Sequence, residues 1–141
     1  MIDSVCAQKM LTDGYTCVLV KGDDIYTSKK AGIAPMIEFI ERDVDLKGFS
    51  VADKIVGKAV SMLFVLAGIK DVYAQTMSRS AKEFLDRHNV PNKCEKLVDR
   101  IINRKGDDIC PMEKTVLDID SPELAFTALK EKLNSMRNGM V

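Results

Sequence analysis

The feature that most constrains this chain is a long apolar stretch between Ser50 and Gly68. A helix over Val51–Ala67 would be apolar on nearly every face, and such a helix is buried in the centre of a domain rather than laid on its surface. Ser50 would begin it in a capping-box pattern, with Asp53 in the position usually held by Glu. Gly68 would end it.

Strand and helix patterns alternate around this predicted central helix. Tyr15–Val20 and Ile25–Ser28 are rich in β-branched and aromatic residues and flank the turn signal Gly22–Asp24, so they predict an N-terminal hairpin. Lys70–Met77 predicts a further strand, and Ser78 or Ser80 caps the helix that follows it, which ends at Asn89 and Pro91. Four helices are predicted elsewhere, at 4–11, 36–43, 110–113 and 121–136.

Residues 95–103 are compatible with either a helix or a strand. The apolar spacing of Leu97, Val98, Ile101 and Ile102 is helical, whereas the order of the neighbouring elements favours a strand near Val98–Ile102. With helices between its strands, the chain predicts an α/β sandwich with parallel pairing beyond the hairpin.

Composition fits one domain over residues 1–141, with a core at about 10–116 and a C-terminal helix at about 121–136. Apolar residues make up 46% of the chain, and 21 basic residues balance 21 acidic ones. This neutral balance gives no long-range attraction to a nucleic acid polymer or an anionic membrane, and neither partner is expected. An apolar surface would allow a homo-oligomer.

The four cysteines, with no CxxC pair and no apparent signal peptide, favour reduced thiols and a cytoplasmic location. A catalytic zinc ion needs three Cys, His or carboxylate ligands, and the chain has one histidine. His88 is expected to bond a carbonyl at a helix end. No metal and no cofactor are therefore expected.

On the predicted central helix, Lys54, Lys58 and Ser61 recur at i, i+4 and i+7 and share one face. Together with Asp53 and the helix N-terminus, they would form a site for a small anion. Gly57 would let a ligand or another backbone approach closely. The alternative is structural: the lysines extend from a half-buried helix and Asp53 is a cap.

Two further positions have similar alternatives. Thr76 and Ser78 lie where a strand leads into a helix, at the sheet edge where α/β proteins bind ligands, although Ser78 is also a good cap. Cys110 precedes Pro111 at a predicted helix start, which favours a reactive thiolate, whereas a small residue packed under a turn would be inert.

Several strings resemble an uncharacterised family of small bacterial and archaeal proteins, defined as a domain of unknown function and assigned to the cytidine-deaminase-like superfamily. The resemblance covers about Met10 to Val116 and is carried by residues 32–35, 48–59, 101–104 and 110–114. It implies a three-layer sandwich with a mixed sheet, an N-terminal hairpin and a buried central helix. It also adds Asn103 and Glu113 to the candidate ligand-binding residues.

The resemblance does not extend to deaminase chemistry. Zinc deaminases carry H-x-E or C-x-E at the start of the central helix and P-C-x-x-C after the next strand. Here the corresponding strings are Asp53-Lys54-Ile55 and Met77-Ser78-Arg79-Ser80.

The sequence therefore predicts a module that binds a small anionic molecule, such as a nucleotide or a related metabolite. The alternative is a metal-independent enzyme that uses Cys110 as nucleophile or Lys58 as acid, base or amine nucleophile.

Overall fold

The molecule is built on a mixed five-stranded sheet with strand order β2-β1-β3-β4-β5. The computed structural model describes residues 2–103 and 105–138. The strands are β1 (Cys17–Lys21), β2 (Asp24–Ser28), β3 (Ser50–Val56), β4 (Asp71–Ser78) and β5 (Asn92–Val98). β1 is antiparallel to both β2 and β3, whereas β3, β4 and β5 are mutually parallel. The predicted hairpin and the parallel pairing beyond it are confirmed.

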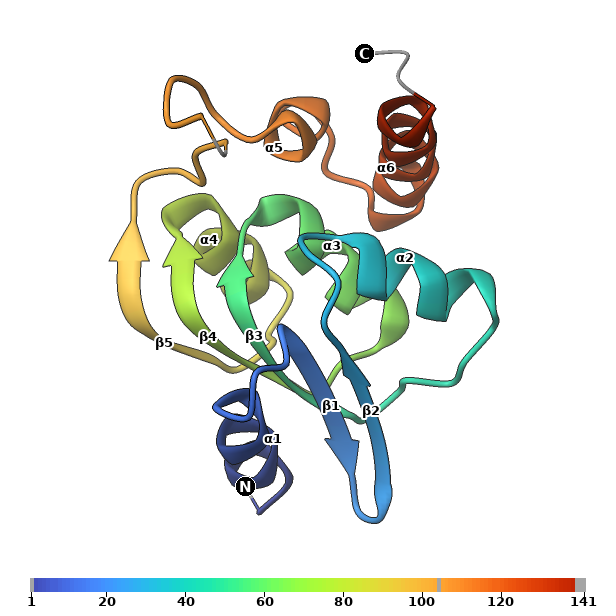
Figure 1. Ribbon diagram of the computed structural model, residues 1–141, viewed down its shortest axis with the longest axis vertical. Helices are drawn as coiled ribbons and strands as arrows, with labels where there is room; N and C mark the ends of the chain where they lie inside the picture. Colours follow the sequence, from blue (N-terminus) through green and yellow to red (C-terminus); the bar gives the residue numbers. More distant parts are fainter. Residues whose placement is uncertain (1, 104, 139–141) are drawn as a thin grey trace.

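Helices cover the two faces of this sheet unequally (Figure 1). On one face α1 (Ile2–Leu11) buries Ala7 and Leu11 against β1 and β3. The other face carries α3 (Lys58–Ala67), which packs against α2 (Ala34–Glu41), α4 (Arg79–Arg87) and α6 (Pro122–Arg137). Successive side chains of a strand point to opposite faces, so Val18 and Val20 meet α1 while Cys17 and Leu19 enter the larger core.

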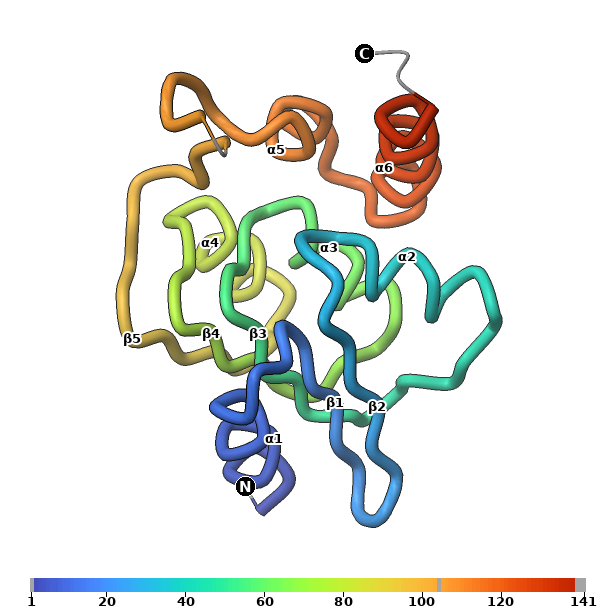
Figure 2. Tube along the Cα trace, in the orientation of Figure 1, coloured from blue at the N-terminus to red at the C-terminus, as the bar shows by residue number. Residues whose placement is uncertain are grey.

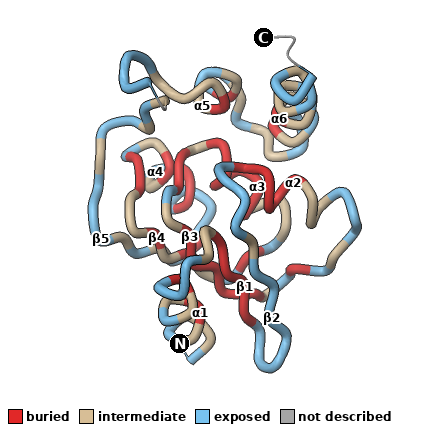
Figure 3. The backbone as a smooth tube through the Cα atoms, viewed as in Figure 1, coloured by how far each residue is buried: buried red, intermediate tan, exposed pale blue. Residues whose placement is uncertain are grey.

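The chain reaches its last helices by a long connection from β5. It runs through the short helix α5 (Pro111–Thr115) and returns to α6 beside α3, a path that is followed most easily in Figure 2. Buried residues concentrate in β1, β3 and α3 (Figure 3). Within the described residues, no helix has both the length and the apolar composition needed to cross a membrane.

The prediction of one helix over Val51–Ala67 is wrong. Residues 50–56 form β3, a central strand hydrogen-bonded to β1 and β4, and α3 begins only at Lys58, after Gly57. Ser50 is therefore a buried strand residue and not a helix cap. A strand buried on both faces has no two-residue polar alternation, and its pattern of apolar residues cannot be distinguished from that of a buried helix.

A second boundary also differs from its prediction. β5 ends at Val98, so the strand predicted near Val98–Ile102 lies too far along the chain, and Ile102 makes only an isolated bridge to Ile109. Of the two serines predicted as alternative caps, Ser78 caps α4: its Oγ accepts from the Ala81 amide. At the start of α6, Ser121 Oγ accepts from the Leu124 amide.

Candidate functional site

The N-terminus of α3 is occupied by a carboxylate from the chain itself. Glu113, on α5, accepts a hydrogen bond at Oε1 from the Lys58 amide and another at Oε2 from the Ala59 amide, both at 2.8 Å. Desolvation raises the pKa of Glu113 above its usual range, and the two amide bonds and the Lys58 charge oppose that rise. The carboxylate thus compensates the partial positive charge of the helix end.

Lys58 makes the reciprocal contact. Its Nζ donates to the carbonyl oxygens of Val116 at 3.0 Å and Leu117 at 3.4 Å, where α5 ends, and lies 3.6 Å from Asp120 Oδ1. Each helix therefore places a charge of complementary sign at the end of the other. We call this arrangement, made by Glu113 and Lys58 between α3 and α5, the reciprocal clasp.

Gly57 is required by the clasp for space. A Cβ atom at this position would lie 2.5 Å from Glu113 Oε1 and 2.7 Å from Oε2. The backbone of Gly57 has φ −104° and ψ −178°, which any residue adopts, so the reason for glycine here is the close approach of the carboxylate. The predicted close approach at Gly57 is thus made by a side chain of the chain itself.

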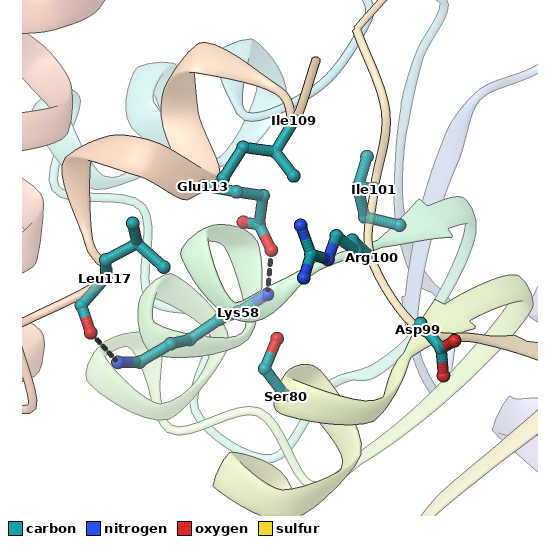
Figure 4. Close-up of a pocket in the computed structure, with 8 residues that line it drawn as sticks. All are labelled: Lys58, Ser80, Asp99, Arg100, Ile101, Ile109, Glu113 and Leu117. Carbon is teal, nitrogen blue, oxygen red and sulfur yellow. Dashed lines mark hydrogen bonds between the residues drawn. The ribbon is translucent and has the colours of Figure 1, made fainter. Parts of the chain in front are cut away.

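A pocket of about 440 Å³ opens beside the clasp, at the carboxyl ends of β4 and β5 and the start of α4. Lys58, Glu113 and Leu117 form one wall, and Ser80 of α4 lies across from them (Figure 4). The segment after β5 supplies the remaining lining residues: Asp99, Arg100, Ile101 and Ile109. This edge of a parallel sheet is where open α/β folds bind their ligands.

Among the described residues that line this pocket, Arg100 is the cation without an acidic partner. Among the described residues, no carboxylate oxygen lies within 4.0 Å of its guanidinium group. By contrast, the Lys58 ammonium group is engaged by the clasp, and Asp99 pairs with Arg79 Nε at 2.8 Å. Figure 4 shows the Arg100, Glu113 and Ser80 side chains directed toward the same space.

Asp53 and Lys54 lie apart from this pocket. They line a smaller hollow of about 120 Å³ with Thr16, Gly32 and their neighbours. Asp53 is only 6% exposed, and burial raises its pKa to about 7 against weaker opposition from the Ile55 and Lys54 amides. Burial, and secondarily the Asp53 charge, also raise the pKa of the adjacent Cys17 thiol.

The face predicted to unite Lys54, Lys58 and Ser61 does not exist, because Lys54 belongs to β3 while Lys58 and Ser61 belong to α3. Ser61 is fully buried, and its hydroxyl donates to the Gly57 carbonyl. Thr76 lies within β4 opposite Ile55 and Lys96.

The other candidate residues hold local structure. Ser78 is the buried cap of α4. Asn103 organises a turn by accepting bonds from the Gly106 and Asp107 amides. Cys110 precedes the first residue of α5, half-buried, and is not among the residues that line the larger pocket.

Lys58 and Glu113 were both among the predicted ligand-binding residues, whereas Arg100, Ile101, Ile109 and Leu117 were not predicted. The charged pair Asp99-Arg100 directly follows β5 and so lies at the carboxyl edge of the parallel strands, whereas the strand predicted near Val98–Ile102 would have placed Arg100 inside it. The string Asp53-Lys54-Ile55, which the sequence placed at the start of the central helix, lies in β3. The observed start of that helix carries Gly57, Lys58 and Ala59 instead. Within residues 2–103 and 105–138, no three His, Cys, Asp or Glu side chains gather in a way that could hold a metal ion.

Comparisons with known proteins agree with this fold. A crystal structure of a DUF1893 family protein (TM1506) from Thermotoga maritima superposes with a TM-score of 0.83, covering 91% of this chain and 87% of that one at 24% identity. No curated protein matches the sequence. The family model described as a domain of unknown function (DUF1893) matches residues 6–133, and the chain therefore belongs to the DUF1893 family.

Proposed function

We propose that this protein is a binding module for a small anionic molecule, such as a nucleotide or a related metabolite. The observation that carries the proposal is the Arg100 guanidinium group, which lines the larger pocket and has no acidic partner among the described residues. Guanidinium groups bind carboxylates and phosphates through two parallel hydrogen bonds. The N-terminus of α4, with the Ser80 hydroxyl, adds positive potential to the same pocket.

The size of the pocket supports this proposal. Its volume of about 440 Å³ is within the range of small-molecule sites, and the walls from Ile101, Ile109 and Leu117 are apolar. The site for the anion differs from the one expected at the start of the central helix, because Glu113 already occupies that helix end.

We further propose that the architecture is related to that of the cytidine deaminases. The N-terminal hairpin, the buried helix α3 between β3 and β4, and helices on both faces of a mixed sheet support this relation. Binding is favoured over catalysis by Cys110 or Lys58, since Cys110 does not line the pocket and the Lys58 ammonium group is already hydrogen-bonded to backbone carbonyls.

The proposal is tested by thermal denaturation with named anions: inorganic phosphate, ribose 5-phosphate, adenosine 5′-monophosphate, citrate and 4-methylpentanoate. At least one should raise the midpoint, because a ligand at 100 times its Kd adds about 2.7 kcal/mol to the free energy of unfolding. Arg100→Gln should remove most of that shift. The matched control Arg42→Gln changes an exposed arginine at the end of α2, outside the pocket, and should retain it. If no molecule with a carboxylate or phosphate group shifts the midpoint, or if Arg100→Gln keeps the full shift, the proposed function is rejected.

A further inference from the structure

The larger pocket presents two opposite charges that are not paired with each other. Glu113 and Arg100 both line it, yet no oxygen of Glu113 lies within the 4.0 Å that defines an ion pair with the Arg100 guanidinium group. Both side chains point toward the same space (Figure 4). Two opposite charges that face the same space without forming an ion pair are complementary to a molecule that carries both charges itself.

Glu113 is fixed in position but retains hydrogen-bonding capacity. An ionised carboxylate offers about four lone-pair sites, and the amides of Lys58 and Ala59 use one on each oxygen. The remaining sites are available to a donor in the pocket. The clasp immobilises the carboxylate before any ligand binds. The binding free energy of a donor at this site is therefore reduced only little by the ordering of the Glu113 side chain.

We infer that the ligand is a zwitterion of the α-amino acid type with an aliphatic side chain, its carboxylate bound by Arg100 and its ammonium group by Glu113. This inference rests on the proposed function, because Arg100 still binds a carboxylate, and it adds an ammonium group to the ligand. The side chain would lie against Ile101, Ile109 and Leu117. These three residues are the apolar part of a lining whose other members are charged or hydroxylic.

The experiment compares L-leucine with two analogues that each lack one charge, by isothermal titration of the full chain. 4-Methylpentanoate lacks the ammonium group, and 3-methylbutylamine lacks the carboxylate. L-Leucine should bind at least about 10-fold more tightly than either analogue, because each charge-assisted hydrogen bond lost weakens binding by about that factor.

Two variants assign the charges to residues. Arg100→Gln should weaken L-leucine about 10-fold or more and leave 3-methylbutylamine unchanged, whereas Glu113→Gln should weaken L-leucine and leave 4-methylpentanoate unchanged. Arg42→Gln is again the matched control. Glu113 also holds the clasp, so if its variant fails to fold, the comparison of the three ligands on the unaltered protein still decides.

The outcomes separate this inference from the proposed function. If 4-methylpentanoate or another anion binds through Arg100 as tightly as L-leucine, the zwitterion is rejected and the anion-binding function stands. If L-leucine does not bind while adenosine 5′-monophosphate does, the inference is likewise overturned. If no anion and no zwitterion binds, both fall together.

Discussion

Asp53 brings a carboxyl group into the middle of the sheet, next to Cys17 on the neighbouring strand. Desolvation disfavours the ionised form, and the nearby backbone amides offset this only in part, so the pKa stands at about 7 in the folded protein. In the unfolded chain the pKa is about 3.9. The folded state therefore binds more protons than the unfolded state between about pH 4 and pH 7, and its free energy of unfolding falls as the pH rises through that window.

Replacing Asp53 with Asn removes this dependence. Asp53→Asn should flatten the free energy of unfolding between about pH 4 and pH 7, and at pH 8 it should be more stable than the unaltered protein by up to about 4 kcal/mol. Urea denaturation at a series of pH values measures both effects. Asp23→Asn, at the exposed hairpin turn, is the control and should change neither. A variant with the same pH dependence as the parent would show that Asp53 is already ionised in the folded protein between about pH 4 and pH 7.

At the scale of elements, the reciprocal clasp joins α3 to a segment more than 50 residues away in sequence. It also accounts for two of the strings singled out from the sequence. Gly57, Lys58 and Ala59 provide the space and the two amides, and Glu113 provides the carboxylate that fits them. The clasp forms one wall of the larger pocket, so the same contacts that hold α5 in place also shape the candidate site.

A double-mutant cycle tests the clasp. Gly57→Ala and Glu113→Ala should each lower the free energy of unfolding by about 1–3 kcal/mol, because either one breaks the bonds between the carboxylate and the amides. Once the carboxylate is absent, the added methyl group has room, so Gly57→Ala should change the free energy of unfolding only slightly in the Glu113→Ala background. The expected coupling is about 1 kcal/mol or more.

The matched control for this cycle pairs Gly57→Ala with Glu131→Ala, an exposed glutamate on α6, and its effects should add. Additive effects in the Gly57 and Glu113 pair, measured by urea denaturation, would mean that the methyl group and the carboxylate do not compete for the same space.

At the scale of the whole molecule, α6 belongs to the main core rather than to an appended tail. Ala125 and Leu129 are fully buried in the same apolar cluster as Phe64 of α3 and Val116. The described part of the chain therefore has one large core on the α3 side of the sheet and a small one under α1.

Leu129→Ala tests whether α6 unfolds together with the rest. The substitution should lower the free energy of unfolding by about 2–5 kcal/mol and keep a single cooperative transition, because the cavity opens inside the shared core. Leu124→Ala on the same helix, at a position 66% exposed, should change it by no more than about 0.5 kcal/mol. Circular dichroism during urea and thermal denaturation measures both variants. A separate early transition of α6, with the main midpoint unmoved, would contradict this account.

The sequence by itself determined the elements whose signals are local. The hairpin turn at Gly22, a serine cap of α4 at Ser78 or Ser80, and the start of α6 near Ser121 each act over a few neighbouring residues, and the structure confirms all three, with Ser78 as the cap. Only the tertiary structure decided that residues 50–56 form a strand. A continuous run of apolar residues is compatible with a buried helix and with a buried strand, and its neighbours in space determine which of the two forms. It alone also brought Glu113 to α3 and Arg100 to the pocket, since contacts between residues distant in sequence depend on where the strands end in space and leave no periodic pattern in the chain.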